Sequence, residues 1–238
     1  MEAIVRVSLL LWLGHSLLTA NASPLQLARE MVDRVAVDSN AYTHRPLVWQ
    51  LPETGPACFR GDCSGLLVLT FREAFGWNGA SFRSNTGAER PLAKHLFDAV
   101  GPGRAFLPVM KVDELRAGDW VFVRYQETNA GRDTGHVMLV AADFSADWGR
   151  SATPPILPGA RQYSLPIIDS TIGPHGAGDS REGRSTNGGI GRGNLRLYAS
   201  GDGIPLGYAW SLSERSIYRD ASRAPLRLAR LSPSILDP

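Results

Sequence analysis

The sequence predicts an α+β protein in which a cysteine-bearing helix packs on an antiparallel β-sheet. Apolar residues recur at helical spacing mainly in the first half of the chain. Segments with the alternation and β-branched content of strands follow in the second half. Turn-forming residues separate consecutive strands, and this order of helices before strands is typical of an antiparallel sheet with helices segregated to one side.

The length and charge of the chain limit the classes of protein to which it can belong. Its 238 residues suit one generous domain, which we place at residues 23–238. The 25 basic and 23 acidic residues leave a formal net charge of +2. Nucleic-acid binding needs a concentrated basic face. We therefore expect no nucleic-acid partner.

The first 22 residues have the features of a secretory signal peptide. Arg6 precedes an apolar run at residues 7–18, and Ala20-Asn21-Ala22 has the small-x-small form of a signal-peptidase site. The run is too short for a comfortable membrane span, and no later segment reaches span length. We predict cleavage after Ala22 and a periplasmic or secreted mature protein without a stable membrane span.

The mature chain is expected to begin with a helix. Pro24 suits a first helical turn, and an apolar stripe continues to about Val37. Residues 38–40 then break the helix. The proline-containing segment at 41–60 reads as irregular structure that leads to the next helix.

That next helix carries Cys63 in its first turn. Asp62 or Ser64 can cap its start, and Gly76 can end it. Unpaired backbone amides and the positive end of the helix dipole stabilise a thiolate at this position. We interpret Cys63 as a nucleophile.

The rest of the chain is expected to hold one short helix and the strands of the sheet. We read residues 76–87 and 173–193 as glycine-rich loops, and a loop as long as the second is usually a functional lid or disordered. The tail from Ser222 shows little periodicity. The predicted short helix covers 91–100, and the predicted strands cover 119–123, 135–141, 164–171, 194–199 and 207–212.

A cysteine nucleophile needs a base and a third group that orients the base. His136 directly follows Gly135 at the start of a predicted strand, where its side chain can face the helix end. Asp169 lies on the next predicted strand and can accept a hydrogen bond from the imidazole. His175, in the glycine-rich loop, is the competing third residue. The backbone amides of Cys63 and Ser64 are candidates for an oxyanion hole.

Other interpretations of the cysteines and histidines stay open at this point. Cys58 lies five positions before Cys63, so the two could form a disulfide, or Cys63 could be an inert core thiol. The histidines lack the spacing of a zinc site, so we expect no metal and no cofactor.

Three motifs resemble those of the NlpC-type cysteine peptidases. They are Asp-Cys-Ser-Gly-Leu at 62–66, Leu-Arg-Ala-Gly-Asp-Trp-Val-Phe at 115–122 and Gly-His-Val-Met-Leu-Val at 135–140, in the order that the family has. Asp169 stands where the family often has histidine. The family's tyrosine upstream of the cysteine has no clean match, and the segment between residue 136 and residue 169 is longer than usual.

The resemblance covers a core at about 47–212 and implies a papain-like fold and a cell-wall hydrolase without a cofactor. Cys63 would be the nucleophile, His136 the base and Asp169 the third catalytic residue. The substrate would be peptidoglycan stem peptides, cut by an endopeptidase. Two alternatives remain: an amidase or acyltransferase acting on another amide or a lipid, and a non-catalytic periplasmic domain with a Cys58–Cys63 disulfide. The sequence does not predict an oligomeric state.

Overall fold

The computed structural model describes residues 22–126, 134–150, 152–183 and 187–236. Almost all of the predicted signal peptide, residues 1–21, therefore lies outside the described part of the chain, as does most of the turn before Gly135. None of the helices in the described part has the length and hydropathy that crossing a bilayer requires.

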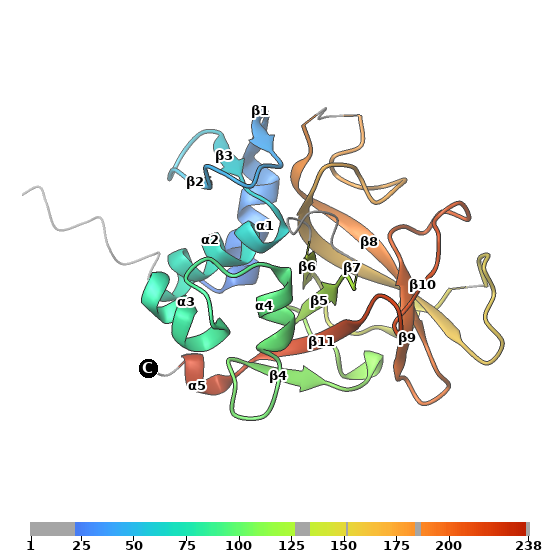
Figure 1. The fold of residues 1–238 in the computed structure, drawn as a ribbon. Helices are drawn as coiled ribbons and strands as arrows, with labels where there is room; N and C mark the ends of the chain where they lie inside the picture. Colours follow the sequence, from blue (N-terminus) through green and yellow to red (C-terminus); the bar gives the residue numbers. More distant parts are fainter. Residues whose placement is uncertain (1–21, 127–133, 151, 184–186, 237–238) are drawn as a thin grey trace, which may run out of the picture.

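The fold mixes helices and strands, and most of its helices precede the main run of strands (Figure 1). The helices are α1 (Pro24–Arg34), α2 (Cys63–Phe75), α3 (Gly79–Thr86), α4 (Ala93–Asp98) and α5 (Pro233–Leu236). The strands are β1 (Val35–Ala41), β2 (Val48–Gln50), β3 (Ala57–Arg60), β4 (Phe106–Val109), β5 (Trp120–Arg124), β6 (Gly135–Val140), β7 (Arg161–Thr171), β8 (Gly189–Ala199), β9 (Pro205–Ala209), β10 (Arg219–Asp220) and β11 (Leu226–Leu231).

The main sheet has eight strands in the order β10-β9-β8-β7-β6-β5-β11-β4. Every neighbouring pair in it is antiparallel, which confirms the predicted antiparallel sheet. A smaller sheet, β1-β3-β2, lies beside α1 (Figure 1).

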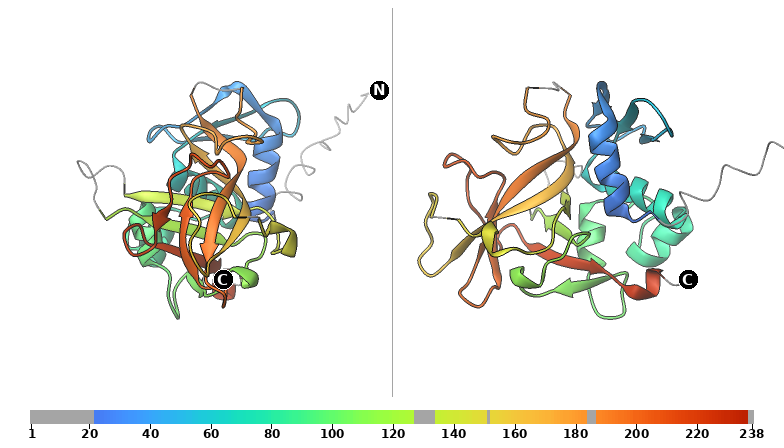
Figure 2. Two further views of the ribbon diagram at one scale, coloured as in Figure 1. Left: turned by 90° about the vertical axis from the view of Figure 1, so that its right-hand side faces the viewer. Right: turned by 180° about the vertical axis from the view of Figure 1, so that it is seen from behind.

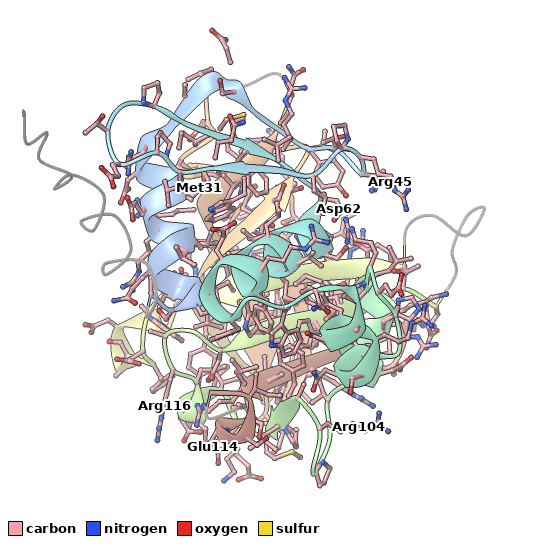
Figure 3. The ribbon with its side chains drawn as sticks, turned by 90° about the vertical axis from the view of Figure 1, so that its left-hand side faces the viewer. Met31, Arg45, Asp62, Arg104, Glu114 and Arg116 are labelled. Carbon is pink, nitrogen blue, oxygen red and sulfur yellow. The ribbon has the colours of Figure 1, made fainter. Side chains whose placement is uncertain are left out.

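Helix α2 packs on β6 and β7, at the centre of the main sheet. The side chain of Asp62 caps its first turn, and Gly76 ends it with a left-handed φ of 65°. Residues 63–71 of α2 are all buried, because α1 and the main sheet pack against the helix. Figure 3 shows Asp62 at the start of α2, close to the loop that carries Arg45.

Hydrophobic side chains cover both faces of the main sheet. In β5, Trp120 and Phe122 belong to the cluster under the helices, whereas Val121 and Val123 belong to a second cluster on the opposite face. Both faces of β5 are therefore buried, which explains why its sequence is a continuous apolar run. Figure 2 shows the strands from β7 to β10 extending away from the helices.

Several predicted boundaries in the first half of the chain are wrong. Helix α1 ends at Arg34, and the residues after it form β1, because they pair with β3 in the small sheet. The irregular segment 41–60 contains β2 and β3. The predicted loop 76–87 contains α3, since the side chains of Asn78 and Ser81 make reciprocal capping hydrogen bonds with each other's backbone amides.

The second half also departs from expectation at two elements. β8 begins at Gly189, inside the predicted glycine-rich loop, because it pairs with β7 along its whole length. β11 lies in the tail that showed little periodicity, and it fills the position between β5 and β4. Leu25 of α1 and Ala229 of β11 share one hydrophobic cluster with residues of α2.

Candidate active site

The structure brings together the three residues that the sequence singled out. Cys63 opens α2, His136 is the second residue of β6 and Asp169 lies on β7, and all three are buried. The Nε2 atom of His136 is 2.6 Å from Oδ2 of Asp169. The Sγ atom of Cys63 lies 4.0 Å from the carbonyl oxygen of Gly135. The side chain of His136 interacts with that of Cys63 as well as with Asp169, so the thiol, the imidazole and the carboxylate form a connected series.

The imidazole of His136 is arranged to carry a positive charge. Burial alone would lower its pKa, but the charge of Cys63 and the hydrogen bonds with Cys63 and Asp169 raise the pKa of His136 to about 10. Since Nε2 faces Asp169, Nδ1 is the nitrogen that remains for the thiol. This electrostatic balance favours the imidazolium form of His136 at neutral pH.

The backbone amides in the first turn of a helix have no partner within the helix. The Asp62 side chain accepts a hydrogen bond from the amide of Gly65, and its backbone carbonyl accepts one from Leu66. Among the described residues, the amides of Cys63 and Ser64 have no acceptor. They are the two groups that the sequence nominated for an oxyanion hole.

Asp62 is fixed by a cluster of its own. Nη2 of Arg90 lies 3.0 Å from both carboxylate oxygens, and Nδ1 of the exposed His44 lies 2.9 Å from Oδ2. The Ser64 hydroxyl donates to Asp62 across 3.0 Å. Burial would raise the pKa of Asp62, but Arg90, His44 and the Gly65 amide together lower it. The ionised cap therefore holds the first turn of α2, and Cys63 with it.

Asp169 belongs to a charged cluster with His175, which the sequence offered as the competing third residue, and with Arg181 and Asp179, which it did not nominate. Nε2 of His175 lies 2.8 Å from Oδ2, the same oxygen that faces His136. Nη1 of Arg181 lies 2.9 Å from Oδ1, and the guanidinium also pairs with Asp179. His175 thus contacts Asp169, and Asp169 is the residue that contacts His136.

These charges strongly favour an ionised Asp169. Burial would raise its pKa, but the neighbouring His175 and Arg181, together with the hydrogen bond from His136, hold it well below its usual range. The carboxylate can therefore orient the His136 imidazole and stabilise its protonated form.

Glycines on β8 make room for this cluster. A Cβ atom on Gly191 would lie 2.7 Å from Nε of Arg181, and one on Gly193 would lie 2.6 Å from Oδ2 of Asp179. The alternation of glycines at 189, 191 and 193 on one strand face is the sequence signal that bulky side chains cover that face.

Trp210, which follows β9, completes the surroundings of the two histidines. Its ring meets the His136 ring edge-on, with centroids 5.2 Å apart. Its backbone carbonyl faces Nδ1 of His175. The indole therefore covers one side of His136 with an apolar surface.

The donor set of His136, Asp169 and His175 also meets the minimum for a metal site, because the three donor atoms lie within 4.8 Å of one another. However, the nitrogens are 2.6 and 2.8 Å from the shared oxygen, which are hydrogen-bond distances. When zinc is bound tetrahedrally through bonds of about 2.0 Å, two neighbouring ligand atoms lie roughly 3.3 Å from each other. The arrangement fits a hydrogen-bonded cluster better than a metal centre.

Both cysteines are free thiols in this structure. Cys58 lies on β3 and is half-buried, whereas Cys63 is buried at the start of α2.

Comparison with known proteins gives one similar sequence. The chain is 28% identical over 196 residues to the uncharacterized protein R653 of Acanthamoeba polyphaga mimivirus, covering 80% of this chain and 86% of that protein. The chain matches no protein-family model, and no solved structure matches it.

Proposed function

We propose that the protein is a cysteine hydrolase that cleaves amide bonds with Cys63, His136 and Asp169. The observation that carries this proposal is the buried series from the thiol to the carboxylate, in which the pKa of His136 is raised to about 10. A nucleophile, a base and an orienting group in contact are the minimum for covalent amide hydrolysis.

In the proposed reaction, the Cys63 thiolate attacks the carbonyl carbon of the amide. The amides of Cys63 and Ser64 donate hydrogen bonds to the oxyanion that forms. The C–N bond then breaks, and the His136 imidazolium gives its proton to the leaving amine. Neutral His136 next takes a proton from water, whose oxygen attacks the thioester and releases the carboxylic acid and Cys63.

The proposed substrate class is the peptide part of peptidoglycan. The support is the resemblance of the segments at 62–66, 115–122 and 135–140 to the motifs of the NlpC-type peptidases, which also leads us to propose a papain-like fold and peptidoglycan endopeptidase activity. The apolar start of the chain supports export to the periplasm or beyond. The alternative substrate is another amide or an acyl group, which the same thiol chemistry would cleave or transfer.

Digestion of purified peptidoglycan tests the proposal. The protein from Ser23 onward is incubated with the wall under reducing conditions, and the soluble products are identified by mass spectrometry. We expect stem-peptide fragments from the wild type and none from the Cys63→Ala variant.

The matched control is Cys58→Ala, which removes the other thiol and should release the same fragments as the wild type. Circular dichroism must show that all variants are folded. Parallel assays on acylated amines and esters separate the two substrate classes. Equal release by wild type and Cys63→Ala, or no turnover of any amide or ester, would contradict the proposal.

A further inference from the structure

His175 has an acceptor at each of its two ring nitrogens. Nε2 lies 2.8 Å from the Asp169 carboxylate, and Nδ1 faces the backbone carbonyl of Trp210. A neutral imidazole has one N–H and one lone pair, so it can satisfy only one acceptor. The imidazolium, with two N–H groups, satisfies both.

The surrounding charges agree with a protonated His175. Asp169 and Asp179 are each paired with Arg181, so this buried cluster holds two carboxylates and one guanidinium. Both carboxylates also lie against His175, because Asp169 faces its Nε2 and Asp179 accepts its backbone amide. Two anions at such short range favour the imidazolium form of His175.

We propose that His175 is a positioning residue, held as an imidazolium, that shares the Asp169 carboxylate with His136 and so moderates the basicity of His136. The proposal rests on the proposed cysteine chemistry for its consequence, but the charge of His175 can be measured without any activity.

The neighbours of His175 come from β6, β7, β8, its own loop and the segment after β9. Asp169 of β7 contacts its Nε2, and the Asp179 carboxylate accepts its backbone amide across 2.8 Å. His136 of β6 is 6.5 Å away between ring centroids. β8 presents Gly193, which brings no charge. Burial would lower the pKa of His175, but Asp169 and the Trp210 carbonyl raise it, against a smaller opposing effect of His136.

The consequence for catalysis is a weaker base and a stronger acid at His136. A positive charge 6.5 Å away disfavours the His136 imidazolium. With an effective dielectric constant of about 20, its removal should raise the pKa of His136 by about 1–2 units. His175 therefore keeps His136 able to return its proton to a leaving amine.

The test is a titration of ¹⁵N-histidine-labelled protein by NMR, from pH 6 to pH 12.5. In the wild type we expect both nitrogens of His175 to carry protons at pH 7. The Cys63→Ala variant should show the same doubly protonated His175, so this result does not depend on whether the protein is a hydrolase. A neutral His175 at pH 7 in both proteins would overturn the proposal.

The His175→Gln variant then separates charge from packing. Its amide can still donate to Asp169 but carries no charge, so the midpoint of the His136 titration should move up by about 1–2 pH units. His95→Gln, on α4, removes a histidine that does not contact Asp169 and should leave the midpoint unchanged. A folded His175→Gln protein with the wild-type midpoint, or a lower one, would refute the electrostatic role.

Discussion

Asp169 is the residue on which the candidate site depends. One carboxylate oxygen accepts hydrogen bonds from His136 and His175, and the other accepts one from Arg181. The residue is completely buried. A buried carboxylate with three cationic partners is stable only while all of its partners remain in place.

We predict that Asp169→Asn destabilises the fold by about 3–5 kcal/mol, because it leaves buried positive charges without their anion. The folded-state pKa of Asp169 is depressed, so its contribution to stability is present above about pH 4 and is lost as the pH falls. Urea unfolding at pH 7 and pH 3 measures both effects. The exposed pair of Asp33 with Arg192 provides the control, since Asp33→Asn should change the unfolding free energy by less than about 1 kcal/mol. Equal effects of the two substitutions would contradict this prediction.

The pH dependence of amide cleavage should have its alkaline limit at His136. Because the pKa of His136 is raised to about 10, its imidazolium persists through neutral pH and is lost only as the pH rises through that value. We therefore expect kcat to hold up to about pH 9 and to fall above it. An ordinary histidine has a pKa of about 6.5. A fall in kcat centred near pH 7 would therefore contradict this assignment.

The central residues of the site were predictable, and their supporting residues were not. A capped helix start identified Cys63, a strand start suggested His136, and the place of Asp169 on the next predicted strand suggested Asp169. Arg181 was missed because it lies in a segment without periodicity and reaches Asp169 only through the long β7–β8 pairing. The alternating glycines of β8 were visible, but their partners depend on tertiary packing.

At the scale of elements, β8 and the loop that precedes it act as one unit. The face of β8 at residues 191 and 193 has no side chains of its own, and the side chains of His175, Asp179 and Arg181 occupy that space. The cluster around Asp169 therefore depends on a strand with no direct chemical role.

Gly193→Ala should disturb this unit. Its new Cβ would lie 2.6 Å from the Asp179 carboxylate and 2.9 Å from Cβ of His175, so the loop must move. We expect a loss of about 1–3 kcal/mol in unfolding free energy and a large loss of amide cleavage. Gly173→Ala, on the same loop, meets nothing within 4 Å and should leave both quantities unchanged. Thermal unfolding and the cleavage assay compare the two, and similar behaviour of both variants would contradict the packing argument.

Elements with strong local signals were predicted better than those made by long-range pairing. Helix α2 has its cap at Asp62 and its end at Gly76, both of which the sequence marks. β11 was missed, because its partners β4 and β5 lie about a hundred residues earlier in the chain. The segment becomes a strand only through its pairing with β4 and β5.

At the scale of the whole molecule, β11 closes the sheet from a distant part of the chain. It pairs with β5 and β4, and Arg230 in it binds the buried carboxylate of Asp119. A chain that ends at Ser222 would lack this strand and would leave two strands of the main sheet without their neighbour.

We predict that the chain ending at Ser222 does not fold into a soluble monomer, whereas a chain ending at Ser232, which loses only α5 and the last residues, does. Size-exclusion chromatography and circular dichroism of the two proteins measure this directly. A soluble, folded Ser222 form would mean that β11 is not part of the essential core.

The measurement that tests the central claim most directly is the rate of alkylation of each cysteine by iodoacetamide at pH 6, read by peptide mass spectrometry. An ordinary thiol is only about 0.3% ionised at that pH, so a Cys63 thiolate paired with His136 should react roughly a hundredfold faster than Cys58 in the same molecule. His136→Ala should remove that advantage while the protein stays folded. Equal labelling of the two cysteines, or fast labelling of Cys63 that survives the loss of His136, would contradict the account of an activated thiol.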